Sequence, residues 1–418
     1  MLIEKKGRAA VNKKFYKKLK TKKSNNSCNK LLFYFIILLN FGIIIIIFIN
    51  NFYINKRISN IEEIIKQINI LGQINNSINN NINNNNISKQ LINSNTNNIK
   101  FNTTSDIIPV NYNYIKNGEF NQKINDKYIE EQNYFCDNQQ KFYNSLFEGK
   151  IRLAQIKYGD KNFTMFVYNK IDVVNNQIIR SKQWELWETR NLIKGLNYYS
   201  NKKKIENKDI YIIDIGANIG WYSFIFGKYG YKVISFEPSK INNYILRKNY
   251  CLNKEVNITI INKGLYNEEK ICDLYNLINN EGNGMAICEN NNTLPDFLFK
   301  NKTGEIILTK LSNYIPFLSD KNLALIKIDV EGSEGKAFEG GIELITKYHV
   351  PFIFIEFTPK SLQLHGTDPK KFLQIFVDNG YKLGLNGFFS NYISIDNIMR
   401  RNFSIINIYI VYSKILGF

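Results

Sequence analysis

Continuous apolar runs alternate with amphipathic segments over the second half of the chain. The apolar runs have the length of strands, and the segments between them carry apolar residues at helical spacing. Such strands are typical of a parallel sheet with helices on both faces. The predicted strands are residues 210–216, 232–237, 257–264, 323–330, 351–357, 381–387 and 405–413, and the predicted helices are residues 219–229, 239–252, 333–347 and 368–379. The pattern predicts an α/β, Rossmann-like sheet that binds ligands at the carboxyl ends of its strands.

A smaller unit precedes this sheet. Residues 151–159 and 162–169 read as strands, and a Trp-rich helical segment follows in which Trp184 and Trp187 are spaced by three positions. We expect both indoles to pack against the sheet rather than to form a sugar-stacking platform. We interpret residues 107–208 as an N-terminal extension of a catalytic domain that spans residues 209–418, with a looser stretch between its third and fourth strands.

Near the N-terminus, residues 31–49 contain no charge and one Asn in nineteen positions. As a helix they extend about 28 Å, close to the ~30 Å hydrocarbon core of a bilayer. The run is apolar on all sides, unlike a helix at the surface of a soluble core, and it is too long for a cleaved signal peptide. The sequence therefore predicts a transmembrane helix over residues 31–50 that contacts the lipid bilayer.

About half of the net charge of +19 lies before this helix, where residues 1–30 hold eleven Lys and Arg and one acid. The positive-inside rule then keeps this basic tail in the cytosol and sends the remaining chain across the membrane. We expect a single-pass protein of the Golgi or ER with a luminal catalytic domain, joined to its anchor by an Asn-rich, largely disordered stalk over residues 51–106. A charge this localised does not form a groove for nucleic acid, so no nucleic-acid partner is expected.

The chain has five Cys without a CxxC pair and only two His. This composition makes a structural zinc site or a disulfide framework unexpected, although one luminal disulfide stays possible. His365 follows the fifth strand of the predicted sheet. It is a candidate for contact with a substrate, against the simpler interpretation of a solvated surface residue.

The first strand of the sheet ends in a turn rich in small residues, which contains Asp214, Gly216, Asn218 and Gly220. Such a turn lets the backbone approach a ligand, and the following helix presents free N–H groups. The second strand ends in Glu237-Pro238, where a carboxylate can accept both hydroxyls of a ribose. Together these features favour an adenosine-type ligand, and the G-x-N-x-G spacing favours S-adenosylmethionine (SAM) over NAD. A glycine-rich turn without a ligand is the structural alternative.

The fourth strand ends in K-x-D-V-E-G, residues Lys327 to Gly332, and the fifth ends in Ile355-Glu356. In combination with D-x-G-A-N-x-G and F-E-P, this pattern resembles the FkbM family of SAM-dependent methyltransferases over roughly residues 209–385. The resemblance implies a class I methyltransferase fold, a mostly parallel seven-stranded sheet whose last strand, residues 405–413, is antiparallel. It also implies methyl transfer to oxygen in most members.

The resemblance assigns roles to particular residues. Asp214, Gly216, Asn218 and Gly220 would surround the methionine portion of SAM, and Glu237, with Pro238, would hold the ribose. The positions near the adenine and the pocket rim would be Gly264, Leu265 and Asn283. One departure is that residues 264–267 lack the acidic residue that many members carry there.

Methyl transfer to a hydroxyl needs a base that takes its proton. The predicted sheet brings Asp329, Glu331 and Glu356 to one edge, where they could act as that base, with Lys327 as a neutralising cation. Asp329 and Glu331 could instead bind a divalent cation. An ion pair between Lys327 and Asp329 that only ties strand to loop is the structural alternative.

The leading hypothesis is a membrane-anchored O-methyltransferase that acts on a glycan or another small hydroxylated acceptor. Two alternatives remain open. One is a binding protein built on a catalytically inactive methyltransferase fold, and the other is an NAD-linked oxidoreductase.

Overall fold

A computed structural model describes residues 120–139, 149–169, 173–277, 280–288, 299–401 and 405–417. All of them belong to the unit Phe101–Phe418. The predicted basic tail (1–30), membrane helix (31–50) and Asn-rich stalk (51–106) lie outside the described residues. Among the helices that are described, none is both long and apolar enough to cross a membrane.

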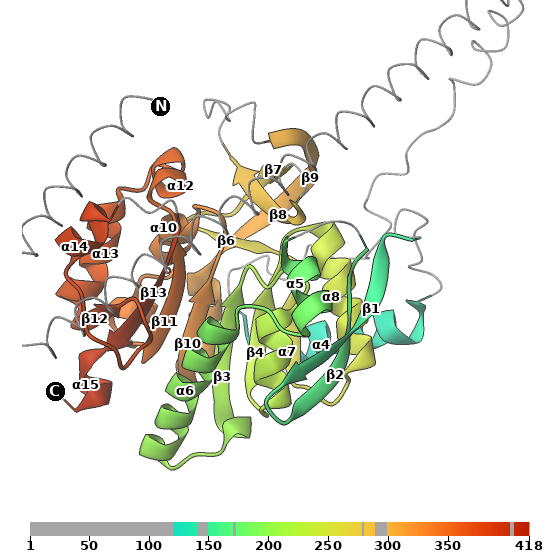
Figure 1. Cartoon of the computed structure of the whole chain (residues 1–418), viewed down its shortest axis with the longest axis horizontal. Helices are drawn as coiled ribbons and strands as arrows, with labels where there is room; N and C mark the ends of the chain where they lie inside the picture. Colours follow the sequence, from blue (N-terminus) through green and yellow to red (C-terminus); the bar gives the residue numbers. More distant parts are fainter. Residues whose placement is uncertain are drawn as a thin grey trace, which may run out of the picture. The chain divides into compact units, whose positions relative to one another are not determined.

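A seven-stranded sheet forms the centre of the fold, with strand order β12-β13-β11-β10-β3-β4-β5 (Figure 1). Its strands are β3 (Ile210–Ile215), β4 (Lys232–Phe236), β5 (Ile258–Ile261), β10 (Asn322–Ile328), β11 (Phe352–Phe357), β12 (Tyr381–Gly384) and β13 (Ile406–Tyr412). Each corresponds to one of the predicted strands. β13 runs antiparallel to β11 and β12, as expected of the last strand, and the other neighbours in this sheet are parallel.

Helices cover both faces of this sheet because successive strand residues point to opposite sides. In β11, Phe352 and Phe354 join one apolar cluster, and Ile353 and Ile355 join the other. The first cluster includes residues of α6 (Leu186–Lys203), α7 (Trp221–Lys228) and α8 (Lys240–Leu252). The second includes residues of α10 (Glu334–Glu339), α11 (Glu343–Thr346), α13 (Pro369–Asp378) and α14 (Ile395–Arg400). Shorter elements are α5 (Val173–Ser181), η4 (Asn207–Asp209), η5 (Leu311–Tyr314), α9 (Ile315–Leu318), α12 (Pro359–Leu364) and α15 (Ser413–Leu416).

The helix predicted over residues 333–347 is broken into α10 and α11. Gly340 lies at the break, and a Cβ atom there would come within 2.1 Å of the carbonyl oxygen of Tyr266. The break therefore allows the end of α10 to approach the backbone of the second sheet closely.

This second sheet has four strands in the order β6-β9-β7-β8 and was not predicted. Its strands are β6 (Gly264–Tyr266), β7 (Lys270–Leu277), β8 (Asn280–Ile287) and β9 (Phe299–Lys310). Figure 1 shows it as a separate layer beyond the ends of the central strands. Most of its strand pairs are antiparallel, as is the hairpin of β1 (Ile151–Tyr158) and β2 (Lys161–Tyr168). The described strands therefore form a mixture of parallel and antiparallel pairs. The expectation of a mostly parallel sheet is corrected accordingly.

The segment before the hairpin forms α4 (Gln122–Asp137), which lies along the edge strand β5. Gln132 of α4 is fully buried. Its amide nitrogen donates to the carbonyl of Ile258 at 2.9 Å, and its amide oxygen accepts from the N–H of Ile260 at 2.6 Å. One side chain thus pairs backbone groups that an edge strand leaves without a strand partner.

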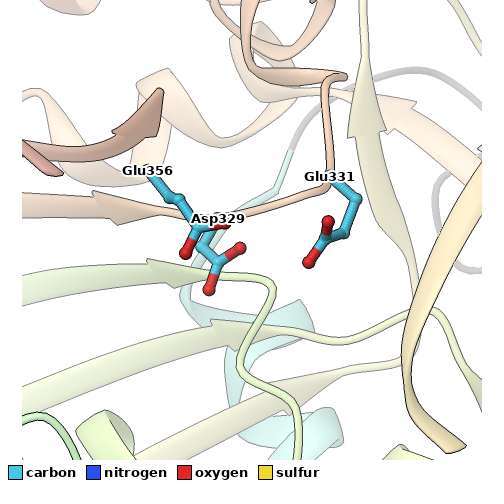
Figure 2. Close-up of side chains that lie close together, drawn as sticks. All are labelled: Asp329, Glu331 and Glu356. Atoms are coloured by element: carbon cyan, nitrogen blue, oxygen red, sulfur yellow. The ribbon is translucent and has the colours of Figure 1, made fainter. Parts of the chain in front are cut away.

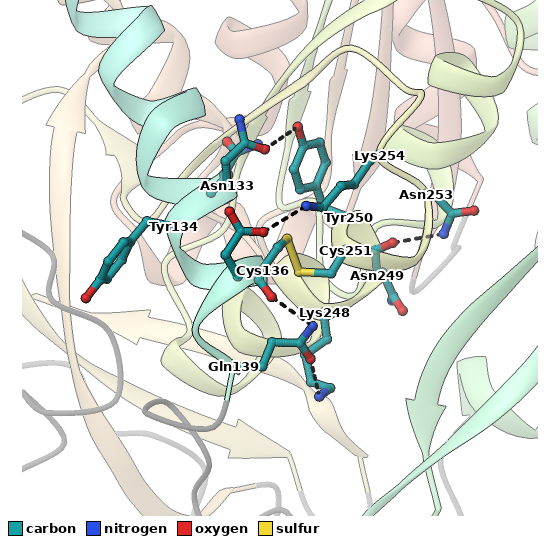
Figure 3. Close-up of a disulfide and its surroundings, with 12 residues drawn as sticks. Asn133, Tyr134, Cys136, Gln139, Lys248, Asn249, Tyr250, Cys251, Asn253 and Lys254 are labelled. Carbon is teal, nitrogen blue, oxygen red and sulfur yellow. Dashed lines mark hydrogen bonds and ion pairs between the residues drawn. A yellow bond between two sulfur atoms is a disulfide. The ribbon is translucent and has the colours of Figure 1, made fainter.

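Two disulfides correct the expectation that the cysteines form no framework. Cys136 of α4 is bonded to Cys251 of α8, across 115 residues of sequence (Figure 3). Cys272 of β7 is bonded to Cys288, just after β8, across 16 residues. The first bond holds α4 against the central body, and the second closes the β7–β8 hairpin.

Candidate functional site

A cavity of about 280 Å³ opens at the carboxyl ends of the central strands. Its walls include the segments that follow β3, β4 and β10, the end of β11, and the β7–β8 hairpin of the second sheet. This volume lies near the lower limit of ordinary small-molecule sites, about 300–1,000 Å³. The cavity therefore occupies the position where open α/β sheets bind their ligands.

The turn after β3 is shaped by Gly216, whose φ of 75° lies in the left-handed region. A Cβ atom at this position would meet the carbonyl oxygen of Asp329 at 1.9 Å. The N–H groups of Gly216 and Ala217 both donate to the carbonyl of Phe236 at 3.0 Å. The glycine thus allows the turns after β3, β4 and β10 to meet at one point.

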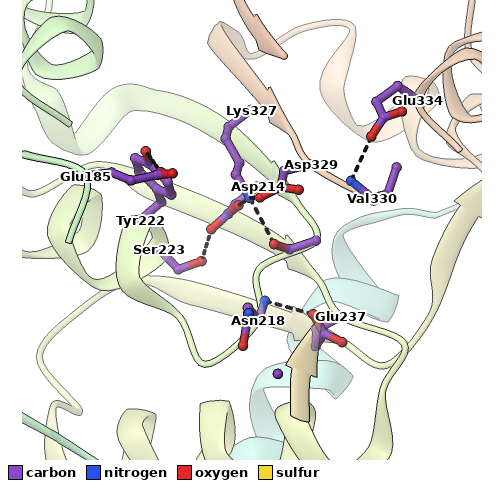
Figure 4. Close-up of polar contacts among 12 residues, drawn as sticks. Glu185, Asp214, Asn218, Tyr222, Ser223, Glu237, Lys327, Asp329, Val330 and Glu334 are labelled. Atoms are coloured by element: carbon purple, nitrogen blue, oxygen red, sulfur yellow. Dashed lines mark hydrogen bonds and ion pairs between the residues drawn. The ribbon is translucent and has the colours of Figure 1, made fainter. Parts of the chain in front are cut away.

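Glu237 follows β4 and is 5% exposed. Its two carboxyl oxygens accept from the N–H of Asn218 at 2.7 Å and from the N–H of Ser239 at 2.9 Å (Figure 4). Burial raises the pKa of Glu237 to about 7, against these hydrogen bonds, which lower it. The oxygen that accepts from Ser239 also accepts from the side-chain amide of Asn242 at 3.5 Å. The oxygen that accepts from Asn218 keeps a second lone pair, which can accept a hydrogen bond from a ribose hydroxyl.

Lys327 of β10 lies between the two strand ends. Its ammonium group donates to the carbonyl of Gly216 at 2.9 Å and lies 3.5 Å from Asp214 and 3.6 Å from Asp329 (Figure 4). Burial by itself lowers the pKa of Lys327, but the carboxylates around it, Asp329 first, raise the pKa to about 12. The predicted ion pair between Lys327 and Asp329 is present, and Asp214 extends it.

Asp329, Glu331 and Glu356 come together after β10 and at the end of β11. One carboxyl oxygen of each lies within 4.8 Å of the others (Figure 2). The negative charge of Asp329, followed by burial, raises the pKa of Glu356 to about 10. Burial, followed by Asp329, raises the pKa of Glu331 to about 8. Carboxyl groups this close share protons near neutral pH, so the cluster can both hold and accept a proton.

The second sheet closes the cavity. Asn242 of α8 donates to the carbonyl of Gly282 in β8 at 2.9 Å, which ties the β7–β8 hairpin to the body beside Glu237. The neighbouring Asn283 makes a side-chain hydrogen bond to Glu331. The hairpin therefore contacts both the Glu237 side and the carboxylate cluster.

The structure gathers most of the predicted site residues around this cavity. Those that line it are Gly216, Asn218, Glu237, Pro238, Gly264, Leu265, Asn283, Lys327, Asp329, Glu331 and Glu356. Asp214 and Gly220 are not among the lining residues. Asp214 is fully buried behind the cavity, where it accepts a hydrogen bond from the hydroxyl of Ser223 at 2.5 Å.

The sequence did not single out Glu185, which lines the cavity together with Trp184. Its only sequence signal is its place in the Trp-rich segment. We expected both indoles to pack against the sheet. For Trp184 this holds in part, because it packs on the core and also lines the cavity. For Trp187 it is wrong, because that side chain is 55% exposed. His365 is not a solvated residue, because it is only 6% exposed, and it does not line the cavity.

The fold and the cavity together define a Rossmann-like α/β protein with a cavity at the carboxyl ends of its central strands. Within it, residues 214–383 match the family described as the methyltransferase FkbM domain. The match begins at Asp214 and includes Glu237 and the whole carboxylate cluster. This part of the chain is therefore a methyltransferase domain.

Solved structures of methyltransferases are also similar to this chain. The precorrin-6y C5,15-methyltransferase from Geobacter metallireducens is 12% identical, with 52% of this chain and 86% of that chain covered and a TM-score of 0.26. The magnesium protoporphyrin IX methyltransferase from Synechocystis, with bound SAM, is 10% identical, with 68% and 96% covered and a TM-score of 0.28. At these TM-scores neither likeness bears on the function of this chain. The comparison with curated proteins gives no match.

Proposed function

We propose that this protein is a SAM-dependent O-methyltransferase that modifies a hydroxyl group of a glycan or another small acceptor. The observation that carries the proposal is the meeting of Glu237, the glycine turn after β3 and the carboxylate cluster around one cavity inside a methyltransferase domain. No part of this arrangement needs a residue outside the described range.

The chain has a cradle that fits SAM. Gly216 and Asn218 line the wall where the methionine portion would lie, and the Glu237 carboxyl group faces the same cavity for the ribose. Gly264 and Leu265 line the wall where the adenine would lie. When bound, SAM supplies a methyl group on a positively charged sulfur, and the leaving group needs no acid.

The carboxylate cluster would handle the proton of the acceptor. A base works best when its pKa lies near the working pH, which favours Glu331, with its pKa of about 8. Glu356, with a pKa of about 10, holds a proton at neutral pH and can donate a hydrogen bond to the acceptor oxygen. Lys327 limits the negative charge that the cluster accumulates.

A divalent cation is a second way to use the same carboxyl groups. Asp329, Glu331 and Glu356 offer three oxygen ligands of the kind that Mg²⁺ and Ca²⁺ prefer. Activity that is lost with a chelator and recovered with added Mg²⁺ would favour the cation. Activity that survives chelation would favour direct proton transfer to a carboxylate.

Membrane attachment through residues 31–50 and a luminal catalytic domain are also part of the proposal. The two disulfides support an oxidising compartment, because such bonds form and persist outside the cytosol. The apolar run and the basic tail of the sequence support the same orientation.

The cofactor is tested by calorimetric titration of the full chain, purified in detergent, with SAM and with S-adenosylhomocysteine. Replacing Glu237 with Ala removes the acceptor of the ribose hydroxyls and should weaken binding by about 30-fold or more, as expected for loss of about 2 kcal/mol of charge-assisted hydrogen bonding. Glu206→Ala is the matched control, because that carboxylate is exposed and does not line the cavity.

The outcomes separate the alternative functions. SAM binding that Glu237→Ala weakens and Glu206→Ala leaves intact supports the proposal. NAD binding in place of SAM would instead identify an oxidoreductase. A folded chain that binds neither would be a binding protein on an inactive methyltransferase fold.

A further inference from the structure

The wall of the cavity includes a corner that precedes the matched domain. Trp184 and Glu185 lie between α5 and α6 and both line the cavity, although the methyltransferase match begins only at Asp214. Glu185 has φ 40° and ψ 53°, a left-handed conformation that is unfavourable for a residue with a side chain. Such strain persists where surrounding contacts impose it, and it is concentrated at binding sites.

Glu185 is held in place from inside the protein. The hydroxyl group of Tyr222, a residue that is only 4% exposed, donates to one of its carboxyl oxygens at 2.5 Å. Burial raises the pKa of Glu185 to about 7, while the Tyr222 hydrogen bond acts in the opposite direction. Figure 4 shows this pair on the Lys327 side of the site, away from Glu237. The corner therefore belongs to the part of the cavity that holds the carboxylate cluster.

Trp184 precedes Glu185 in the chain and also lines the cavity. It is partly buried against the core and also lines the cavity, whereas Trp187, three positions later, is mostly exposed and does not. An indole offers a large apolar surface, and carboxyl and amide oxygens accept from hydroxyls. A pyranose ring has the matching chemistry, with apolar C–H groups on its faces and hydroxyls at its rim.

The charge of the wall restricts which ring can enter. The carboxylic acids that line the cavity are Glu185, Glu237, Asp329, Glu331 and Glu356, and Lys327 is the lone cation among the described lining residues. Its ammonium group is already engaged by Gly216, Asp214 and Asp329. An acceptor with a carboxylate, phosphate or sulfate near the reacting hydroxyl would find no free cation among these residues, and each ionised carboxylate of the wall would repel it.

The same acidity disfavours an amine acceptor. Nearby carboxylates stabilise the protonated form of an amine, which has no lone pair with which to attack the methyl group. A hydroxyl group remains a nucleophile in these surroundings once a carboxylate takes its proton.

We infer that the acceptor is an uncharged sugar residue, and that Trp184 and Glu185 form the subsite that binds its ring. This inference rests on the proposed methyltransferase function. In the transfer, the bond between the acceptor oxygen and the methyl carbon forms as the bond from that carbon to sulfur breaks. The electron pair stays on sulfur and cancels its positive charge, and the hydroxyl proton passes to the carboxylate cluster.

The test uses the full chain in detergent, radiolabelled SAM and p-nitrophenyl glycosides as acceptors. The panel contains the neutral glucoside, galactoside, mannoside, xyloside and fucoside, and the glucuronide as the charged counterpart of the glucoside. We expect transfer to at least one neutral glycoside and at least about tenfold less to its charged counterpart, the effect of about 1.4 kcal/mol of repulsion.

Variants then locate the subsite. Trp184→Ala and Glu185→Gln should each raise the KM and the calorimetric Kd for the accepted glycoside about tenfold or more and leave the Kd for SAM within threefold. Trp187→Ala, the matched control, should leave the KM for the glycoside, the Kd for the glycoside and the Kd for SAM unchanged. Glu185→Gln should also reduce the ratio of glucoside to glucuronide turnover, because it removes a carboxyl group that is ionised in part of the molecules near pH 7.

Three results would overturn the inference: the glucuronide accepted as well as the glucoside, methyl transfer to an amine, or no glycoside accepted by a chain that binds SAM. An unchanged glycoside Kd in both Trp184→Ala and Glu185→Gln would also reject this subsite. Failure to bind SAM is a different outcome, because it would remove the proposed function itself.

Discussion

Gly216 connects the backbone of two strands at the site. The contact between this turn and the carbonyl oxygen of Asp329 leaves no room for a side chain, and the same turn supplies the carbonyl that accepts from Lys327. Position 216 therefore matters for stability as well as for the shape of the cavity.

Replacing Gly216 with Ala should destabilise the domain by about 2–5 kcal/mol, since a methyl group would meet backbone in a left-handed conformation. Gly366→Ala is the matched control, because Gly366 has a similar φ of 72° but no atom within 4 Å of the added carbon. It should cost only about 1–2 kcal/mol. Urea unfolding, followed by tryptophan fluorescence, measures the free energy of unfolding of both variants. An equal loss of this free energy in the two variants would contradict the proposed backbone clash.

His365 should make the fold sensitive to acid. Burial, with a smaller effect of Lys336, lowers the pKa of His365 to about 4 from the model-peptide value of 6.5. Below pH 6.5 the unfolded chain takes up this proton and the folded chain does not. Stability from this group is therefore complete above pH 6.5 and is lost as the pH falls towards 4, by on the order of 3 kcal/mol.

Urea unfolding between pH 7 and pH 4 tests this dependence. His365→Gln should lose less stability over this range than the natural chain. His349→Gln, which removes the other imidazole of the chain, is the control. A pH dependence that His365→Gln leaves unchanged would show that other groups cause it.

At the scale of elements, the long strands could be predicted because they are continuous apolar runs, such as residues 351–357. The carboxylate cluster could be predicted too, since Asp329 and Glu356 follow neighbouring strands. The second sheet could not, because its strands carry Asn, Lys and Glu at positions that are partly exposed, and residues 270–287 show no clear alternation. Glu185 was missed because it reaches the cavity through an unusual backbone conformation, which leaves no spacing signal.

The disulfides were missed for a related reason: the sequence gives no sign of which cysteines the fold brings together. Their effects should differ. A closed loop of 16 residues contributes about 3 kcal/mol by restricting the unfolded chain, and a loop of 115 residues contributes somewhat under 5 kcal/mol.

The double variant Cys272→Ser/Cys288→Ser should weaken SAM binding more than Cys136→Ser/Cys251→Ser does, because the hairpin that it loosens carries part of the cavity wall. The double variant Cys136→Ser/Cys251→Ser should lower the urea midpoint of unfolding more than Cys272→Ser/Cys288→Ser does. Unfolding curves and SAM titrations of both variants, without reductant, make the comparison. The reverse order of effects would show that the hairpin is held by its other contacts.

At the scale of the whole molecule, the proposed orientation has a direct chemical marker. Asn162-Phe163-Thr164 is an acceptor sequence for N-glycosylation, and Asn162 is exposed in β2. If the domain enters the lumen, this position is accessible to the glycosylation machinery.

The chain expressed in a eukaryotic cell should lose mass on treatment with an endoglycosidase, as judged by gel mobility. Asn162→Gln should remove the part of this shift that arises at Asn162. A chain with no sugar at any of its acceptor sequences would indicate a cytosolic domain and would reverse the proposed topology.

The hydrogen bonds between Gln132 and β5 also determine where the chain can be cut. A fragment that begins inside or after α4 would leave the backbone of β5 open, together with half of a disulfide. Open strands of this kind pair with other chains, so such a fragment would aggregate even with its cavity intact. Soluble fragments for crystallisation or assay should therefore begin before Phe120, although the methyltransferase match begins 94 residues later at Asp214.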